Sequence, residues 1–179
     1  MANGALFNEE RTHRQRLWRI WDEHAPLLIV VGKNPSQADE TNNDKTVEQC
    51  QRRAQKRGYG GLRMLNMQDV IETHSHKLRQ MTAEYRCTAA NCAELVAGLD
   101  SAQAGHADIL CAWGGLGQKY GPVAWFTAEA ARRNVTLFCL MVNADGSPHH
   151  PLYVAYTKDF EWFGGVVLDE AGQPLVPAE

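Results

Sequence analysis

Apolar and polar residues alternate in blocks along this chain, and four of the apolar blocks are short and strongly hydrophobic. They are residues 27–32, 62–67, 108–113 and 135–142. Buried parallel strands are encoded as nearly continuous apolar runs, because both faces of such a strand are covered. We therefore predict four buried strands, of which Leu27-Leu28-Ile29-Val30-Val31-Gly32 is the clearest.

Apolar residues at helical spacing predict helices before and between these strands. The predicted helical segments are residues 9–22, 45–57, 88–98 and 118–133. Asp44 can cap the second of these helices and Thr88 the third, and Gly58 can end the second. Residues 33–44 are expected to form a polar loop, and residues 68–87 a long loop with some helix.

Strands that alternate with helices are typical of an α/β protein. We predict a three-layer sandwich with a central, mostly parallel four-stranded sheet and right-handed crossovers. Residues 169–172 indicate a final hairpin turn. A chain of 179 residues can bury a sizeable core, so we assign residues 1–179 to a single α/β domain.

The composition is that of a globular protein, with 44% hydrophobic and 22% charged residues. No apolar stretch approaches the ~20 residues that span a bilayer, and the polar N-terminus does not resemble a signal peptide. The five cysteines are scattered and odd in number, which favours a reducing compartment over a disulfide framework. We expect a cytoplasmic protein without a membrane partner.

The net charge of −3 does not favour nucleic-acid binding, but the positive charges are clustered. One cluster near the start contains Arg11, Arg14, Arg16 and Arg19, and a second contains Arg52, Arg53, Lys56 and Arg57. Each cluster fits either a solvated helix face or a surface that contacts phosphate groups.

Polar residues that can do chemistry follow the first predicted strand. Asn34 comes almost directly after it, and Asp39 and Asp44 lie in the same loop. Ligand sites of α/β proteins form at the carboxyl ends of parallel strands. There a carboxamide can hold a water or a sugar oxygen, and a carboxylate in a closed pocket can act as a general base. Alternatively, Asp39 caps a turn and Asp44 caps the next helix.

Two further strand ends carry groups that can bind a planar ligand. Asn66 ends the second strand, and its amide offers donors and acceptors to the edge of a heterocycle. His149 and His150 follow the fourth strand, where an imidazole can donate to an oxygen on which charge develops. Nothing completes a metal site around His74 and His76, so we expect no bound metal.

Four segments of the chain, taken in order, resemble the uracil-DNA glycosylase superfamily. Gly32-Lys33-Asn34-Pro35-Ser36 is similar to the first motif of that superfamily, in the Gly-x-Asn-Pro form of the mismatch-specific and thymine-DNA glycosylases. Leu65-Asn66 resembles the strand whose asparagine reads the base, and residues 110–121 resemble a Leu-Leu-Trp-Gly strand and its turn. His150-Pro151-Leu152 resembles the His-Pro motif with its wedge residue. The likeness is greatest to a small branch with Asn-Pro-Ser and His-Pro-Leu-Tyr signatures.

The resemblance implies a monomeric enzyme that flips a nucleotide out of DNA and hydrolyses its N-glycosidic bond, leaving an abasic site. Asn34, with Asp39 or Asp44, would position or activate the water, and His150 would stabilise the departing base. Leu152 would fill the vacated stack. Other substrate contacts would come from Gly32, Lys33, Pro35, Ser36, Tyr59, Asn66, His149 and Tyr153, and phosphate contacts from Arg52, Arg53 and Lys56. The resemblance implies neither a metal nor an organic cofactor.

The first motif departs from that of the fast uracil enzymes, because it lacks their Asp-Pro-Tyr and the tyrosine that excludes a 5-methyl group. Tyr59 is the remaining candidate for stacking on the base. A roomier pocket would suit a bulky modified pyrimidine, such as the glucosylated hydroxymethylcytosine of phage DNA. Excision of such a base would act in antiviral defence.

Two other classes of function remain open from the sequence. One is a hydrolase of free modified nucleosides or nucleotides, which the acidic net charge mildly favours. The other is a non-catalytic nucleic-acid binder that uses the pocket for recognition only. Salt-sensitive DNA binding would argue against the first, and formation of an abasic product would argue against the second.

Overall fold

Seven strands form one sheet in the computed structural model, which describes residues 2–164, 167–168 and 174–175. In their spatial order the strands are β1 (Ala2–Phe7), β2 (Arg14–Ile20), β4 (Gly61–Asn66), β3 (Leu27–Gly32), β5 (Ala107–Cys111), β6 (Leu137–Cys139) and β7 (Glu161–Gly164). The four central strands run parallel, and β1, β2 and β7 are antiparallel to their neighbours. A separate short pair consists of β8 (Val167–Leu168) and β9 (Pro174–Leu175). The predicted parallel sheet is thus the centre of a larger, mixed sheet.

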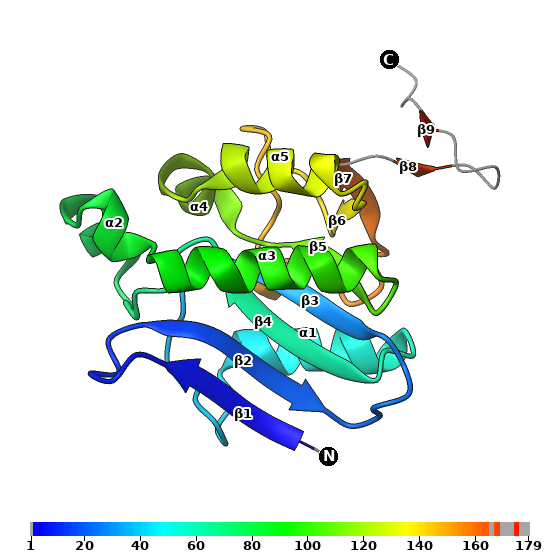
Figure 1. The fold of residues 1–179 in the computed structure, drawn as a ribbon, viewed down its shortest axis with the longest axis horizontal. Helices are drawn as coiled ribbons and strands as arrows, with labels where there is room; N and C mark the ends of the chain where they lie inside the picture. Colours follow the sequence, from blue (N-terminus) through cyan, green and yellow to red (C-terminus); the bar gives the residue numbers. More distant parts are fainter. Residues whose placement is uncertain (1, 165–166, 169–173, 176–179) are drawn as a thin grey trace.

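Helices cover both faces of this sheet (Figure 1). One face is covered by α1 (Lys45–Lys56), and the other by α3 (Ala89–Gln103) and α5 (Val123–Arg132). The shorter helices are α2 (Ala83–Arg86), α4 (Gly114–Tyr120) and the 3-10 turns η1 (Ser75–Gln80) and η2 (Pro151–Tyr153). The α/β class is confirmed.

Alternate residues of β3 feed two hydrophobic clusters, one on each face of the sheet. Leu28 and Val30 pack with Val47, Cys50 and Ala54 of α1. Ile29 and Val31 pack instead on the other face, with side chains of α3 and α5. Because β3 is covered on both faces, its sequence has to be apolar throughout, which is why it was the clearest strand to predict.

Both predicted helix caps are confirmed. The Asp44 carboxylate accepts a hydrogen bond from Val47 N (2.9 Å), and the Thr88 hydroxyl accepts one from Asn91 N (3.2 Å). The third helix runs to Gln103 rather than to Gly98. Gly98 lies inside it because α3 approaches β4 closely there: a Cβ on Gly98 would lie 2.8 Å from the Leu65 side chain.

The helix predicted over residues 9–22 is wrong, because residues 14–20 form strand β2 and pair with β1 and β4. Along β2, Leu17 and Arg19 are buried while Arg16 and Trp18 are only partly buried. The alternation of apolar and polar residues that is typical of a strand is not visible in the sequence, because arginine occupies a buried position. Apolar residues at helical spacing then dominated the pattern.

The predicted helix over 118–133 is in fact two helices, α4 and α5, separated at Gly121-Pro122. Proline lacks an N–H and disfavours a helical conformation in the residue before it, so the helix ends there. The predicted strand over 135–142 is shorter, with only Leu137–Cys139 in the sheet. The predicted hairpin at 169–172 lies outside the described residues. No helix in the described part of the chain is long and apolar enough to cross a bilayer.

Candidate functional site

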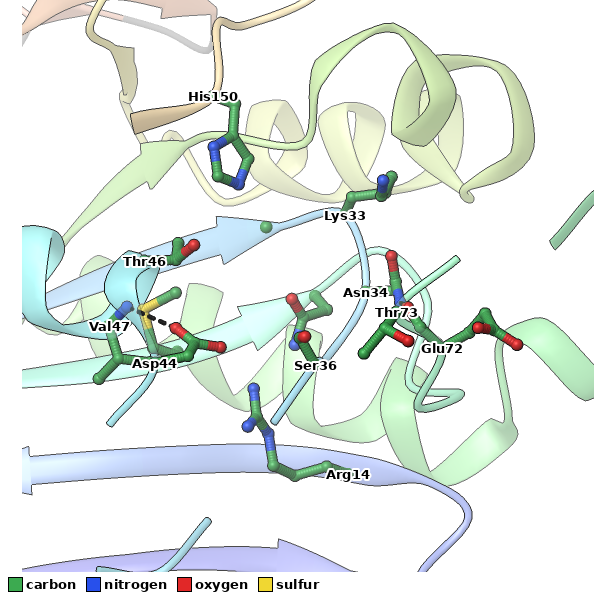
Figure 2. Close-up of a pocket in the computed structure, with 13 residues that line it drawn as sticks. Arg14, Lys33, Asn34, Ser36, Asp44, Thr46, Val47, Glu72, Thr73 and His150 are labelled. Carbon is green, nitrogen blue, oxygen red and sulfur yellow. Dashed lines mark hydrogen bonds between the residues drawn. The ribbon is translucent and has the colours of Figure 1, made fainter. Parts of the chain in front are cut away.

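A cavity of about 140 Å³ lies at the carboxyl ends of β3 and β4, beside the first turn of α1 (Figure 2). It is lined by Arg14, Gly32, Lys33, Asn34, Ser36, Asp44, Thr46, Val47, Met64, Asn66, Glu72, Thr73 and His150. The chain leaves β3 toward α1 on one face, whereas it leaves β4 and β5 toward helices on the other face. Ligand sites of open α/β sheets form where neighbouring connections diverge in this way.

Asn66 and Gly32 are direct neighbours across β4 and β3. A Cβ on Gly32 would lie 2.8 Å from Asn66 Oδ1, so only glycine leaves room for this amide. Asn66 is 3% exposed, and its Nδ2 has no hydrogen-bond partner among the described residues. Its main-chain oxygen accepts from Asn91 Nδ2 (3.0 Å), which fixes the strand end. A buried N–H without a partner is costly, so this donor is available to a ligand.

Asn34 has a structural role through one end of its amide. Its Nδ2 donates to the carbonyl oxygens of Pro35 (2.9 Å) and Glu72 (2.7 Å), joining two loops. This network fixes the orientation of the amide, because only nitrogen can donate. Oδ1 is therefore the atom of Asn34 that can hold a water in the cavity.

The structure separates the two candidate aspartates. Asp44 lines the cavity, and only one of its oxygens is used in capping α1. Asp39 does not line the cavity, and it accepts hydrogen bonds from Thr41 N (2.9 Å), Asn42 N (2.7 Å) and the Asn42 side chain. These bonds hold the pKa of Asp39 well below its ordinary value, which makes it a poor base. Of the two, Asp44 is placed to act on a ligand.

His150 enters the cavity from the opposite side to Arg14 (Figure 2). Burial, reinforced by the positive charge of Lys33, lowers the pKa of His150, and Asp44 partly opposes this. The ring is therefore neutral at neutral pH. Its Nδ1 accepts from Leu152 N (3.4 Å), so the proton of the neutral ring lies on Nε2. The cavity thus contains a neutral imidazole donor.

Arg14 is a cavity residue that the sequence did not single out. It is 3% exposed, and burial lowers the pKa of its guanidinium to about 10. The sequence places Arg14 in a cluster of four arginines that fits either a solvated helix face or a phosphate-contacting surface. No pattern in the sequence distinguishes it from Arg16 or Arg19.

A second hollow of about 260 Å³ adjoins the cavity, and the two share Lys33 and His150. Trp113, Tyr153 and the first three residues of α4 form its remaining walls. Burial lowers the pKa of the Lys33 ammonium, which stands between the two spaces. Tyr153 is 77% exposed, and the preceding Leu152, which lines neither space, is 36% exposed.

Several predicted site residues lie away from the cavity. Pro35 is buried in the loop behind it. The His149 ring is hydrogen-bonded to the Asn143 side chain through Nδ1, and the main-chain N–H of His149 donates to Met141 O (2.7 Å). Tyr59 is wrong as a base-stacking residue: it precedes β4, at the far end of that strand from Asn66, and its hydroxyl donates to Asp108 Oδ2 (2.6 Å).

Of the three predicted phosphate contacts, Arg53 is wrong. It is 0% exposed, and it donates to the carbonyl oxygens of Val154 (2.6 Å) and Ala155 (3.2 Å), which ties η2 to α1. Arg52 and Lys56 are exposed on α1. Lys77 and Arg79 are two exposed cations that the sequence did not indicate. They follow the cavity residues Glu72 and Thr73, in a segment that is anchored by the buried side chain of Leu78.

Among the described residues, no group of three or more His, Cys, Asp or Glu side chains is placed to hold a metal ion. His74 binds the Glu72 carboxylate through its main-chain N–H (2.7 Å). This contact directs the Glu72 side chain toward its own loop. Thr73 and Asn34 lie beside it in this part of the cavity wall (Figure 2).

Residues 14–152 match the model of a protein family described as "Protein of unknown function (DUF1643)". The chain belongs to the DUF1643 family. The matched segment of this DUF1643 protein contains every residue that lines the cavity, from Arg14 to His150. No curated protein and no solved structure matches the chain.

Proposed function

We propose that this protein is a DNA glycosylase that excises a modified pyrimidine and leaves an abasic site. The observation that carries the proposal is the convergence of Asn34, Asp44, Asn66 and His150 on one cavity. These residues come from three segments that are far apart in the sequence: the loop of Asn34 and Asp44, the end of β4, and the segment before η2. They are also the residues to which the resemblance with the uracil-DNA glycosylase superfamily assigns chemistry.

Each of these side chains has a role that fits its surroundings. Asp44 takes a proton from a water that the Oδ1 of Asn34 orients, and the water adds to the sugar C1′. The N-glycosidic bond breaks, and its electron pair leaves with the base. Nε2–H of His150 donates to the base oxygen on which this negative charge develops. Nδ2 of Asn66 binds another acceptor on the base.

The space beside the cavity favours a base with a bulky substituent. The cavity and the hollow next to it adjoin at Lys33 and His150, so a base bound against Asn66 can extend toward Trp113 and Tyr153. Glucosylated hydroxymethylcytosine, a base of phage DNA, has such a substituent. In that case the enzyme would act in antiviral defence.

Binding to DNA would use the exposed rim of the site. Leu152 follows His150 by two residues and is exposed, as a side chain that fills the stack of a flipped base must be. Lys77 and Arg79 lie in the segment that continues from the cavity wall, where they can contact phosphates.

A specific observation favours a second candidate, a hydrolase of free nucleotides. Arg53, one of three residues expected to bind the DNA backbone, is buried, and the net charge is −3. Both weaken the case for a long polyanionic partner. The same cavity could then bind the base of a mononucleotide.

An abasic-site assay tests the proposal. The protein is incubated with duplexes that contain uracil, hydroxymethylcytosine or glucosylated hydroxymethylcytosine, and abasic sites are then cleaved with alkali. We expect strand breaks on at least one modified duplex. The breaks should be lost in His150→Gln and Asp44→Asn and kept in Asp39→Asn, because Asp39 lies outside the cavity.

If the protein releases the base from mononucleotides but leaves the DNA intact, the second candidate is supported instead. Tight, salt-sensitive DNA binding without product from any substrate would overturn both enzymatic functions and leave a binding module.

A further inference from the structure

Arg14 is a buried cation whose hydrogen-bonding capacity is mostly unused. It is 3% exposed, and the one hydrogen bond that its guanidinium makes within the described residues runs from Nη1 to Ala38 O (2.5 Å). Nε–H is buried and has no partner. No described carboxylate lies within ion-pair distance of the guanidinium. A buried charge normally has a counter-charge, because its desolvation is costly.

Arg19, on the same strand, shows what a purely structural arginine looks like here. It donates to four carbonyl oxygens, those of Gly4, Trp18, Asp39 and Asn42, and to the Asn43 side chain. Arg53 is likewise held by two carbonyls and does not line the cavity. Arg14 differs from both because it combines unused donor capacity with a place in the cavity wall.

A break in the strand register directs Arg14 toward the cavity. Leu17 packs in the α1-side cluster, so simple alternation would place Arg14, three positions earlier, on the opposite face of the sheet. The pairing of β1 with β2 shifts at this point, since Leu6 pairs with Arg16 but Phe7 pairs with Arg14. A bulge of this kind re-aims a side chain, and bulges occur often beside functional sites.

The other groups around the cavity also favour an electron-rich ligand. Nδ2 of buried Asn66 is a second unpartnered donor, and the ammonium of Lys33 is a second cation in the wall. The N-terminus of the 12-residue helix α1, with its partial positive charge, lies at the same wall. Two carboxylates line the cavity as well: Glu72 is bound by His74, and Asp44, which caps α1 through one oxygen, offsets part of the positive charge of Arg14.

We infer that the cavity receives an oxyanion of the substrate, a carboxylate or a phosphate, with Arg14 as its counter-ion and Asn66 as a second donor. The inference rests on the proposed function for the kind of molecule that carries the anion, a pyrimidine base or its nucleotide. It narrows that function, because a base with a neutral substituent, such as a glucosyl group, would leave only a phosphate of its nucleotide as the anion for Arg14. The anion is borne either by the base or by the 5′-phosphate.

Binding of matched small molecules tests this inference without requiring catalysis. Calorimetry compares uracil-5-carboxylate with the neutral uracil-5-carboxamide, and uridine 5′-monophosphate with uridine. We expect the wild type to prefer the anion of at least one pair by about 10- to 100-fold, as a charge-assisted hydrogen bond allows. Preference in the first pair places the anion on the base, and preference in the second places it on the nucleotide.

Variants connect this preference to Arg14. Arg14→Gln should reduce the discrimination to about twofold, and Arg14→Lys should keep most of it because the charge remains. Arg19→Gln is the matched control: it should lower the melting temperature and leave the discrimination unchanged. If Arg14→Gln does not fold, the discrimination between anionic and neutral ligands by the wild type and by Arg14→Lys still tests the inference.

Equal affinity of the wild type for anionic and neutral partners, or no binding of either anion, would overturn the inference. Discrimination that survives in folded Arg14→Gln would overturn it too. Anion preference without base release from DNA or nucleotides would support the inference and contradict the proposed function. If the protein excises neutral bases and Arg14→Gln excises them at the same rate, the proposed function is supported and the inference is contradicted.

Discussion

The two ends of the central parallel strands use their polar groups differently. At the amino end, Tyr59 donates its hydroxyl to Asp108 (2.6 Å), and Trp21 Nε1 donates to Tyr59 O (2.8 Å). At the carboxyl end of β4, buried polar atoms without partners accumulate. They belong to Arg14, Asn66, Gln68, Arg86 and Asn91, and the remaining described case, Arg53 on α1, lies elsewhere.

This difference distinguishes structural polar groups from functional ones. At the amino end, Tyr59 and Trp21 find their partners within the protein, so these groups stabilise the fold. At the carboxyl end the fold accepts the cost of buried, unpartnered donors. Two of these groups, Arg14 and Asn66, line the cavity, where a bound ligand can supply their missing partners. Substitutions at the two ends should therefore have opposite effects on activity and stability.

The largest effect should come from the aspartate at the carboxyl end. Asp44→Asn keeps the helix cap, because asparagine caps as well as aspartate, and removes the proposed base. We expect base release to slow by about 10²- to 10⁴-fold in single-turnover assays, with little change in melting temperature. Asp108→Asn at the amino end is the control, with unchanged activity and about 1 kcal/mol lost from the free energy of unfolding. The same rate loss in both variants would contradict the comparison.

Gly32→Ala should damage the carboxyl end by displacing Asn66. The added Cβ would lie 2.8 Å from Asn66 Oδ1, and a displacement of about 1 Å in a substrate-binding group costs about 10²-fold in rate. Turnover at saturating and limiting substrate measures this. Gly164→Ala is the matched control, since nothing lies within 4 Å of a Cβ there. Full activity of Gly32→Ala would show that the position of Asn66 does not matter.

His150 gives the carboxyl end a dependence of stability on pH. Its pKa is lowered from 6.5 in the folded protein, so the unfolded state binds more protons between 6.5 and the lowered value. The contribution is fully present above 6.5 and decreases as the pH falls through that interval. Urea unfolding measures the free energy of unfolding at about pH 7.5 and at about pH 5.5. This free energy should fall less between the two pH values for His150→Gln than for the wild type, by up to ~1.4 kcal/mol per pH unit. Identical losses would mean that the ring is not buried in its neutral form.

The smallest effects should come from exposed cations outside the cavity. Lys77→Glu with Arg79→Glu should weaken DNA binding several-fold and lower the salt dependence by about one unit for each lost contact. The pair Arg52→Glu with Lys56→Glu serves as comparison, because it lies on α1 rather than beside the cavity wall. Fluorescence anisotropy at several salt concentrations measures both. A larger effect of the α1 pair would support the phosphate contacts expected from the sequence.

Local patterns in the sequence sufficed for β3, α1 and the caps at Asp44 and Thr88. A strand buried on both faces must be apolar throughout, and a cap depends on a residue and its next three neighbours. The convergence of Asn34, Asn66 and His150 could be anticipated because the carboxyl ends of parallel strands share one edge.

Non-local contacts decided the rest of the site. Arg14 enters the cavity only through the pairing of β2 and its register shift, and Arg53 is buried only because η2 packs against α1. Tyr59 lies at the wrong end of its strand for the role that its chemistry suggested.

The sequence by itself thus determined the α/β class, the central strands and the polar residues at their carboxyl ends, because apolar runs and caps are local signals. Only the tertiary structure decided which charged side chains are buried. The burial of a charge depends on partners that are distant in the chain, and arginine has the same local pattern on a surface as in a cavity wall.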